Sequence, residues 1–166
     1  MLILGVLSDT HFVQTEGVVP SEIFEALKDA DYIVHCGDIN QYWVMEQLES
    51  IAPVLGVYGN TDPFELVSKL PHKRVLRLAG YEIGITHGEG EGLACNNALQ
   101  HFRSHSLDLL LFGHSHCPES HRIGRTLCFN PGSATKPRCS EQGSIGLVYL
   151  GDHIQTSIQM LKRRAI

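Results

Sequence analysis

The run LILGVLSDTH at residues 2–11 decides the fold more than any other stretch of this sequence, because an apolar segment gives way within two residues to Asp9 and His11. The apolar and β-branched residues 2–7 predict a buried strand. In an open α/β sheet the carboxyl ends of the strands form the crevice in which ligands bind. We therefore expect Asp9 and His11 to lie at such an edge, in a functional site.

Four further predicted strands end in the same way. Apolar runs at 32–36, 54–58, 81–86 and 108–112 are followed by Asp38, Asn60, His87, and His114 with His116. Glycine precedes Asp38, Asn60 and His114, and its freedom in φ would let the chain turn sharply after each strand. The seven polar side chains are thus expected to converge at one edge of a sheet.

The remaining pattern predicts an α/β fold. Apolar residues at helical spacing predict helices over 21–30, 41–51 and 92–104. Their alternation with strands in the first half predicts parallel pairing through right-handed crossovers. In the second half we expect further strands at 74–78, 126–130, 144–150 and 153–160. Short turns there predict hairpins, so we expect two packed mixed sheets with helices on their outer faces, and 131–143 as the longest loop.

Length and charge limit the classes of protein to consider. At 166 residues the chain is the size of one domain, which we place at 1–166. The net charge of -5 argues against a nucleic-acid binder. No stretch approaches the roughly 20 apolar residues of a membrane span, and the N-terminal run is a poor signal peptide. We expect no membrane partner.

The cysteines indicate a reducing compartment. They are odd in number and scattered, with no CxxC pair: Cys36, Cys95, Cys117, Cys128 and Cys139. This fits reduced thiols in a cytoplasmic protein better than a disulfide framework.

The seven side chains at the strand ends form a coherent ligand set for metals, comprising two carboxylates, one amide oxygen and four imidazoles. Seven ligands are too many for one tetrahedral ion but suit two ions that share a carboxylate. Paired ions about 3.5–4 Å apart can hold the attacking and leaving oxygens of a displacement at phosphorus. Hydrolysis of a phosphate ester is the natural reaction. Oxygen and imidazole ligands suit Mn²⁺, Fe²⁺, Co²⁺, Ni²⁺ or Zn²⁺.

The ordered motifs D-x-H, GD, GN, H and GH-x-H, together with NPGS at 130–133, resemble those of the calcineurin-like metallophosphoesterases, in particular the small bacterial and archaeal phosphodiesterases. The resemblance implies a four-layer αββα sandwich, two metal ions with Mn²⁺ preferred, and a metal-bridging water or hydroxide as the nucleophile. It places Asp9, His11, Asp38 and His116 on the first metal. It places Asp38, Asn60, His87 and His114 on the second, with Asp38 as the bridge.

One position departs from the family pattern GNHD, because this chain reads Gly59-Asn60-Thr61-Asp62. Threonine cannot protonate a leaving group near pH 7, and such an acid usually contributes about 10²–10⁴-fold to the rate. We therefore expect a phosphodiesterase acting on a small soluble phosphoester, with a preference for diesters or good leaving groups.

Two alternatives to the phosphodiesterase are open. The first is a catalytically weak protein-binding scaffold, since the fold resembles that of a retromer subunit. The second is a nuclease, which the small chain and negative charge disfavour. Exposed strand edges in the hairpin half would allow a homo-oligomer.

Other chemically capable residues match no motif. Six histidines are expected to be structural or surface residues: His35, His72, His101, His105, His121 and His153. Cys36 and Cys117, next to predicted ligands, are expected to be apolar fillers. Arg138 could bind a phosphate or remain solvated. The basic segment 162–164 is expected to be a charged tail.

Overall fold

The computed structural model describes residues 1–162, so most of the basic segment 162–164 lies outside the described residues. Its first sheet has the strand order β10-β9-β1-β2-β3. These strands are β1 (Leu2–Leu7), β2 (Tyr32–His35), β3 (Val54–Gly56), β9 (Ser144–Leu150) and β10 (Ile154–Met160). β1, β2 and β3 run parallel, while β9 pairs antiparallel with both β1 and β10.

The second sheet has the order β4-β5-β6-β8-β7. It contains β4 (Lys73–Leu78), β5 (Tyr81–Thr86), β6 (Leu109–Leu111), β7 (Pro118–Ile123) and β8 (Thr126–Pro131). β5, β6 and β8 are parallel, and β4 and β7 are antiparallel edge strands. Both sheets are therefore mixed, as predicted.

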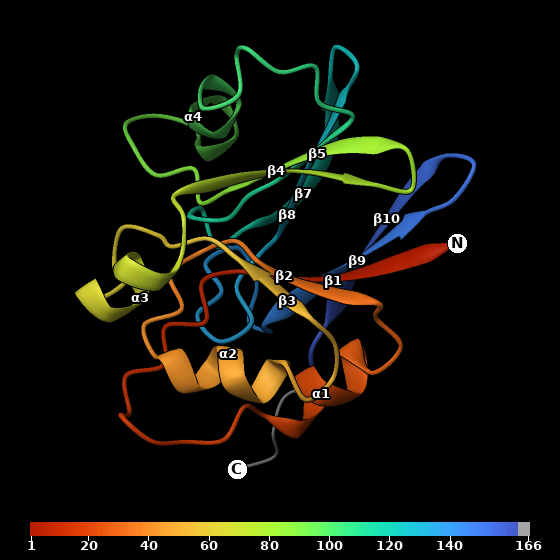
Figure 1. The fold of residues 1–166 in the computed structure, drawn as a ribbon. Coiled ribbons are helices and arrows are strands. Elements are labelled where there is room, and N and C mark those ends of the chain that lie inside the picture. The colour runs from red at the N-terminus through yellow and green to blue at the C-terminus, as the bar shows by residue number, and fades with distance from the viewer. Residues whose placement is uncertain (163–166) are drawn as a thin grey trace.

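Helices cover the outer faces of the two sheets (Figure 1). α1 (Ser21–Leu27) and α2 (Tyr42–Leu48) lie against the first sheet, and α4 (Ala94–Gln100) lies against the second. The short helix α3 (Phe64–Lys69) follows β3. The architecture is the four-layer αββα sandwich that the resemblance implied.

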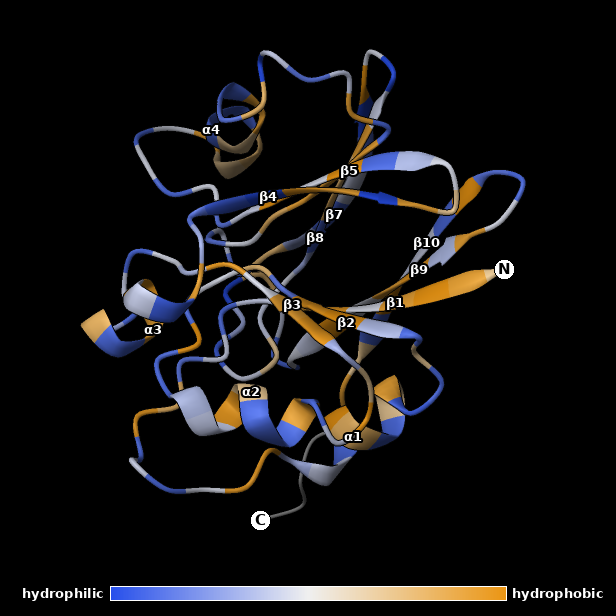
Figure 2. Ribbon diagram, viewed as in Figure 1, coloured by the Kyte–Doolittle hydropathy of each residue, from blue (hydrophilic) through white to orange (hydrophobic). Residues whose placement is uncertain are grey.

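The alternation of side chains along β1 explains how the layers pack. Leu4 and Val6 face the core between the sheets, whereas Leu7 joins the cluster under α1 and α2. Gly5 points toward α1, where a Cβ atom would collide with Leu27, so the missing side chain lets the helix approach the sheet closely. Figure 2 shows the resulting concentration of apolar residues along the strands. Burial of both faces keeps β1 rigid up to the point where the polar residues begin.

The structure departs from the predicted elements in three places. α3 lies in a segment for which no helix was predicted, and its six residues are too few for a periodic pattern to stand out. β7 has the mostly polar sequence PESHRI, typical of an exposed edge strand. β8 pairs with β6 in parallel, because β7 intervenes in the chain, so the second half is not built from hairpins alone. Within residues 1–162, no helix has the length and apolar character to cross a membrane.

Candidate metal centre

All seven predicted ligands follow the carboxyl ends of parallel strands. Asp9 and His11 follow β1, Asp38 follows β2, Asn60 follows β3, His87 follows β5, and His114 and His116 follow β6. Because the strands belong to both sheets, the site lies at one end of the sandwich, where the two sheets meet.

Five of these side chains form one cluster around two carboxylates. Asp38 Oδ2 lies 3.3 Å from His87 Nε2 and 3.5 Å from His11 Nε2. Asp9 Oδ1 lies 3.2, 3.8 and 3.9 Å from the Nε2 atoms of His116, His11 and His87, respectively. Each carboxylate is thus surrounded by imidazole nitrogens at distances suited to sharing a cation.

His114 borders this cluster. Its ring packs edge-on against that of His87, with the ring centroids 5.1 Å apart. Its backbone N–H donates to Asp9 Oδ2 at 3.0 Å.

Asn60 is exposed, and it is the neighbours of Asn60 that touch Asp38. The Thr61 N–H donates to Asp38 Oδ1 at 2.9 Å. Asp62 accepts from the backbone N–H groups of Gly59 and Asn40 at 2.8 and 2.6 Å. The GNTD segment is therefore held firmly against the carboxylate that was predicted to bridge the metals.

The backbone is strained at five of the seven predicted ligands. Positive φ values of 41° to 69° occur at Asp9, His11, Asp38, His114 and His116. A non-glycine residue in this region costs of order 1–3 kcal/mol and persists where surrounding structure enforces it, commonly at functional sites. The concentration of strain at these positions supports a functional role for them.

Glycine was predicted to provide freedom in φ before three of the ligands, and it does so at one of these three positions. Gly37 has a φ of 95°, as expected of a sharp turn. Gly59 and Gly113 do not have positive φ, but a Cβ at either would collide with Asp38 or with Ser8 and Asp9, respectively. At these two positions glycine is needed for space and not for backbone freedom.

The donor set fits a cation. Asp9 Oδ1 and His87 Nε2 are both buried, face the cluster and have no hydrogen-bond partner. Burial disfavours charge on both groups, yet the imidazoles lower the pKa of Asp9, and the carboxylates of Asp38 and Asp9 raise the pKa of His87 to about 9. A metal ion would supply the positive charge that the carboxylates require and a partner for the unpaired atoms.

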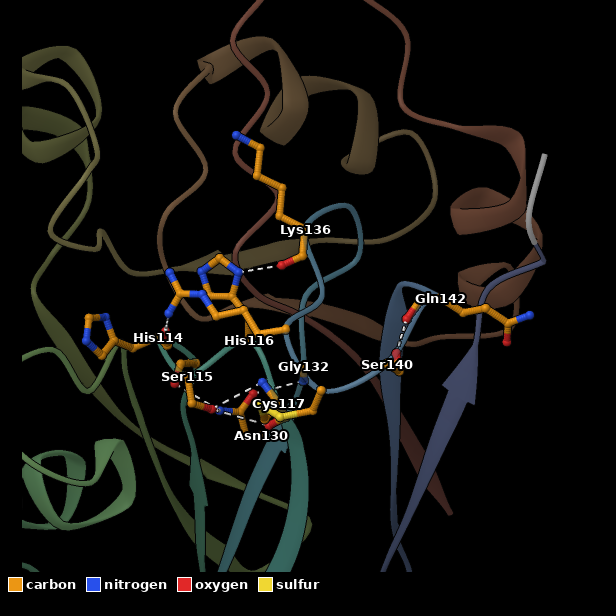
Figure 3. Close-up of a disulfide and its surroundings, with 12 residues drawn as sticks. His114, Ser115, His116, Cys117, Asn130, Gly132, Lys136, Ser140 and Gln142 are labelled. Carbon is orange, nitrogen blue, oxygen red and sulfur yellow. Dashed lines mark hydrogen bonds between the residues drawn. A yellow bond between two sulfur atoms is a disulfide. The ribbon is translucent and has the colours of Figure 1, made fainter. Parts of the chain in front are cut away.

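Two backbone carbonyls orient the imidazoles. The Nδ1 atoms of His87 and His116 lie 2.8 and 2.6 Å from the carbonyl oxygens of Cys36 and Lys136, respectively. Figure 3 shows the contact of His116 with Lys136. When Nδ1 donates to a carbonyl, the Nε2 lone pair is free for a metal, which is the usual support of a histidine ligand.

Residues in and near the NPGS segment hold the site loops together. The buried Asn130 Nδ2 donates to the Gly113 carbonyl at 2.9 Å and to Ser115 Oγ at 3.0 Å (Figure 3). Ser133 Oγ donates to the Asp9 carbonyl at 2.7 Å, and Thr135 Oγ1 donates to the Thr10 carbonyl. The motif predicted a place near the site for Asn130 and Ser133, but Thr135 carried no such signal.

The expectation that all the cysteines are free thiols is wrong for two of them. Cys117, next to His116, forms a disulfide with Cys139 (Figure 3). The partners are 22 residues apart in the sequence, and a bond from the Arg138 N–H to the His116 carbonyl joins the two segments that carry them. The cytoplasmic location inferred from the thiols loses that support. Cys36, Cys95 and Cys128 are free and buried.

Arg138 lies beside the site in the same loop. Its backbone N–H donates to the His116 carbonyl at 3.4 Å, and its guanidinium lies 3.5 Å from the His114 carbonyl. Among the histidines outside the motifs, His35 is fully buried and contacts Thr10 Oγ1 at 3.1 Å, in line with the structural role expected of it.

Comparison with known proteins agrees with this geometry. The model of the calcineurin-like phosphoesterase superfamily domain matches residues 1–153. A probable metallophosphoesterase of Methanothermobacter thermautotrophicus is 29% identical over 158 residues, covering 95% of this chain and 91% of the relative. A phosphodiesterase of Methanocaldococcus jannaschii is 23% identical over 141 residues, covering 78% of this chain and 82% of the relative.

Solved structures share the fold. The crystal structure of Vps29 from Entamoeba histolytica, complexed with zinc, aligns with a TM-score of 0.76 and 19% identity, over 96% of this chain and 99% of that one.

Proposed function

Because the chain belongs to the calcineurin-like phosphoesterase superfamily, we propose that it is a phosphodiesterase that hydrolyses a small soluble phosphoester at a dinuclear metal centre. The observation that carries the proposal is the cluster of Asp9, His11, Asp38, His87 and His116, whose carboxylate and imidazole atoms face one another without full hydrogen bonding. The phosphodiesterase relative supports the choice of substrate class.

In the proposed site, Asp9, His11, Asp38 and His116 hold one ion, and Asp38, Asn60, His87 and His114 hold the other. Asp38 is the proposed bridge, since its Oδ2 lies between His11 and His87. Asp9 also approaches imidazoles from both sets, through its Oδ1 atom. The oxygen and imidazole ligands, without thiolate, suit several divalent metals, and among them we favour Mn²⁺ because of the resemblance to the family.

The bound ions would activate a water and screen charge on the phosphoryl oxygens. The chain supplies the geometry for this chemistry. Cys36 and Lys136 carbonyls orient two imidazoles, and Ser133 and Asn130 hold the loops that bear the ligands. The Arg138 guanidinium lies near enough to the His114 loop to meet a substrate phosphate, which guanidinium binds well.

The direct test is metal analysis of the purified protein combined with hydrolysis of bis-p-nitrophenyl phosphate in Mn²⁺. We expect metal-dependent turnover that falls by at least about 100-fold in His87→Ala, since loss of even an outer partner of a metal ligand costs about 10–100-fold. His105→Ala is the matched control, because this exposed histidine bonds to Glu82, away from the cluster. Metal binding without turnover of any monoester or diester would contradict the proposal.

Metal binding without turnover would instead support a second candidate function, a protein-binding scaffold. The fold shared with Vps29 is the observation behind this second candidate.

A further inference from the structure

A second group of potential metal ligands lies under helix α4, on the outer face of the second sheet. Cys95 is in α4, His121 is in β7 and Cys128 is in β8. His121 and Cys128 are directly opposite each other across the antiparallel pair, so their side chains share one face. Cys95 and Cys128 belong to the buried cluster through which α4 packs on that face. A helix and the hairpin formed by β7 and β8 thus bring two thiols and an imidazole together.

The distances match a thiolate-rich metal site. The two Sγ atoms and one nitrogen of the His121 imidazole all lie within 4.8 Å of one another. Cys95 Sγ is 3.6 Å from His121 Nε2. With Zn–S bonds of about 2.3 Å and Zn–N bonds of about 2.0–2.1 Å, the sulfur-to-nitrogen edge of a tetrahedral zinc site is also about 3.6 Å.

Glu119 supports this orientation of the imidazole. Its Oε2 atom lies 3.6 Å from His121 Nδ1, two residues along the same strand. This separation is longer than a hydrogen bond, but the carboxylate favours the proton on Nδ1 and leaves the Nε2 lone pair directed at the thiols. The side chain of His121 is 40% exposed, which gives an ion a path from solvent and room for a water as fourth ligand.

We propose that Cys95, His121 and Cys128 form a mononuclear Zn²⁺ site that ties α4 to β7 and β8, separate from the dinuclear centre. Two thiolates and one imidazole suit zinc, whereas the dinuclear centre has oxygen and imidazole ligands and no thiolate. On binding, the ion forms two Zn–S bonds, and the two thiol protons are released to solvent. The inference stands whether or not the chain is a phosphodiesterase.

In the metal-free protein, both thiols are protonated. Burial raises the pKa of Cys95 to about 12 and also raises the pKa of Cys128. Zinc would therefore have to displace both protons, as it does when a thiol becomes a ligand. Without metal, the same groups are apolar fillers joined by a weak sulfur-to-imidazole contact.

Cobalt substitution separates this site from the dinuclear centre. Thiolate-to-cobalt charge transfer absorbs in the near ultraviolet, and only a site with cysteine ligands can produce it. We expect the band in protein loaded with Co²⁺ with its disulfide intact, and we expect Zn²⁺ to abolish it by displacement. His87→Ala should keep the band, because that substitution disables only the dinuclear centre.

Variants of the three residues complete the test. Cys95→Ser and Cys128→Ser should remove most of the band, and His121→Ala, at a partly exposed position that tolerates truncation, should weaken Zn²⁺ binding at least about tenfold. His153→Ala, at an exposed histidine that contacts Gln155, is the matched control. It should change neither the charge-transfer band nor the Zn²⁺ affinity. A wild-type protein without the band, or a band that survives in Cys95→Ser, Cys128→Ser and His121→Ala alike, would overturn the proposal.

Discussion

At the scale of single residues, Thr61 occupies the position of the histidine in the GNHD pattern. Its N–H donates to Asp38 Oδ1, and its Oγ1 lies 3.5 Å from His11 Nδ1, so the side chain borders the cluster. A hydroxyl there cannot protonate a leaving group near neutral pH. Leaving-group chemistry should therefore limit the proposed reaction.

Thr61→His should relieve that limit. The new imidazole would lie where an acid can reach the leaving oxygen, so hydrolysis of alkyl phosphodiesters should rise by at least about tenfold relative to aryl phosphodiesters. The measurement is the ratio of kcat/KM for the two substrates in wild type and variant. An unchanged ratio would show that the leaving-group acid is not what this site lacks.

The positions of the predicted ligands at the strand ends could be deduced from the sequence, because each follows an apolar run that indicates a strand. The strain at Asp9 or His116 could not, because a left-handed residue is enforced by tertiary contacts that no local pattern records. The role of Gly113 depends likewise on Ser8 and Asp9, which are about a hundred residues away in the chain.

At the scale of elements, the end of β8 and the residues that follow it, 130–136, act as a brace for the loops of the site. The bonds from Asn130 and Ser133 reach the loops that follow β6 and β1. The rigidity of this brace should therefore control metal affinity, although the brace supplies none of the proposed metal ligands.

Asn130→Ala should weaken the brace and thereby lower metal affinity. The change removes the bonds to the Gly113 carbonyl and Ser115 Oγ and leaves the buried Gly132 N–H unpaired, which costs about 1–3 kcal/mol of unfolding free energy. It should also weaken Mn²⁺ binding about 10–100-fold. Calorimetric titration and denaturant unfolding give the two quantities.

Thr126→Val is the matched control, at the other end of the same strand. It removes a buried hydrogen bond to the Leu107 carbonyl and should lower stability without changing metal affinity. Equal effects of the two variants on metal binding would contradict the proposed role of this segment as a brace.

The disulfide should stabilise the same brace. It links Cys117 to Cys139, 22 positions further along the chain, and keeps the Lys136 carbonyl against His116. Cys139→Ser should lower the free energy of unfolding by about 2–4 kcal/mol. Wild type under reducing conditions should match the variant, while the variant should not respond to reductant. A wild type that is equally stable with and without reductant would rule this role out.

Elements with a strong apolar pattern were predictable from the sequence, whereas elements that form only by pairing with another segment were not. β1 and β5 are buried on both faces, so their sequences alone indicate strands. β7 is mostly polar, and only pairing with β8 makes it a strand. The disulfide escaped prediction for the same reason, since its geometry exists only after the loop has folded.

At the scale of the whole molecule, the function depends on two sheets that end at the same place. The first sheet carries Asp9, His11, Asp38 and Asn60, and the second carries His87, His114 and His116. The apolar core between the sheets fixes their separation and hence the distance between the two halves of the ligand set. A dinuclear centre would in turn bind the sheets together.

Anomalous scattering from crystals of the protein loaded with Mn²⁺ tests this arrangement most directly. We expect two peaks about 3.5–4 Å apart, with Asp38 between them and His11 and His87 on opposite ions. The anomalous difference measured across the manganese absorption edge identifies the element. A single peak, or two peaks that do not share Asp38, would contradict the proposed centre.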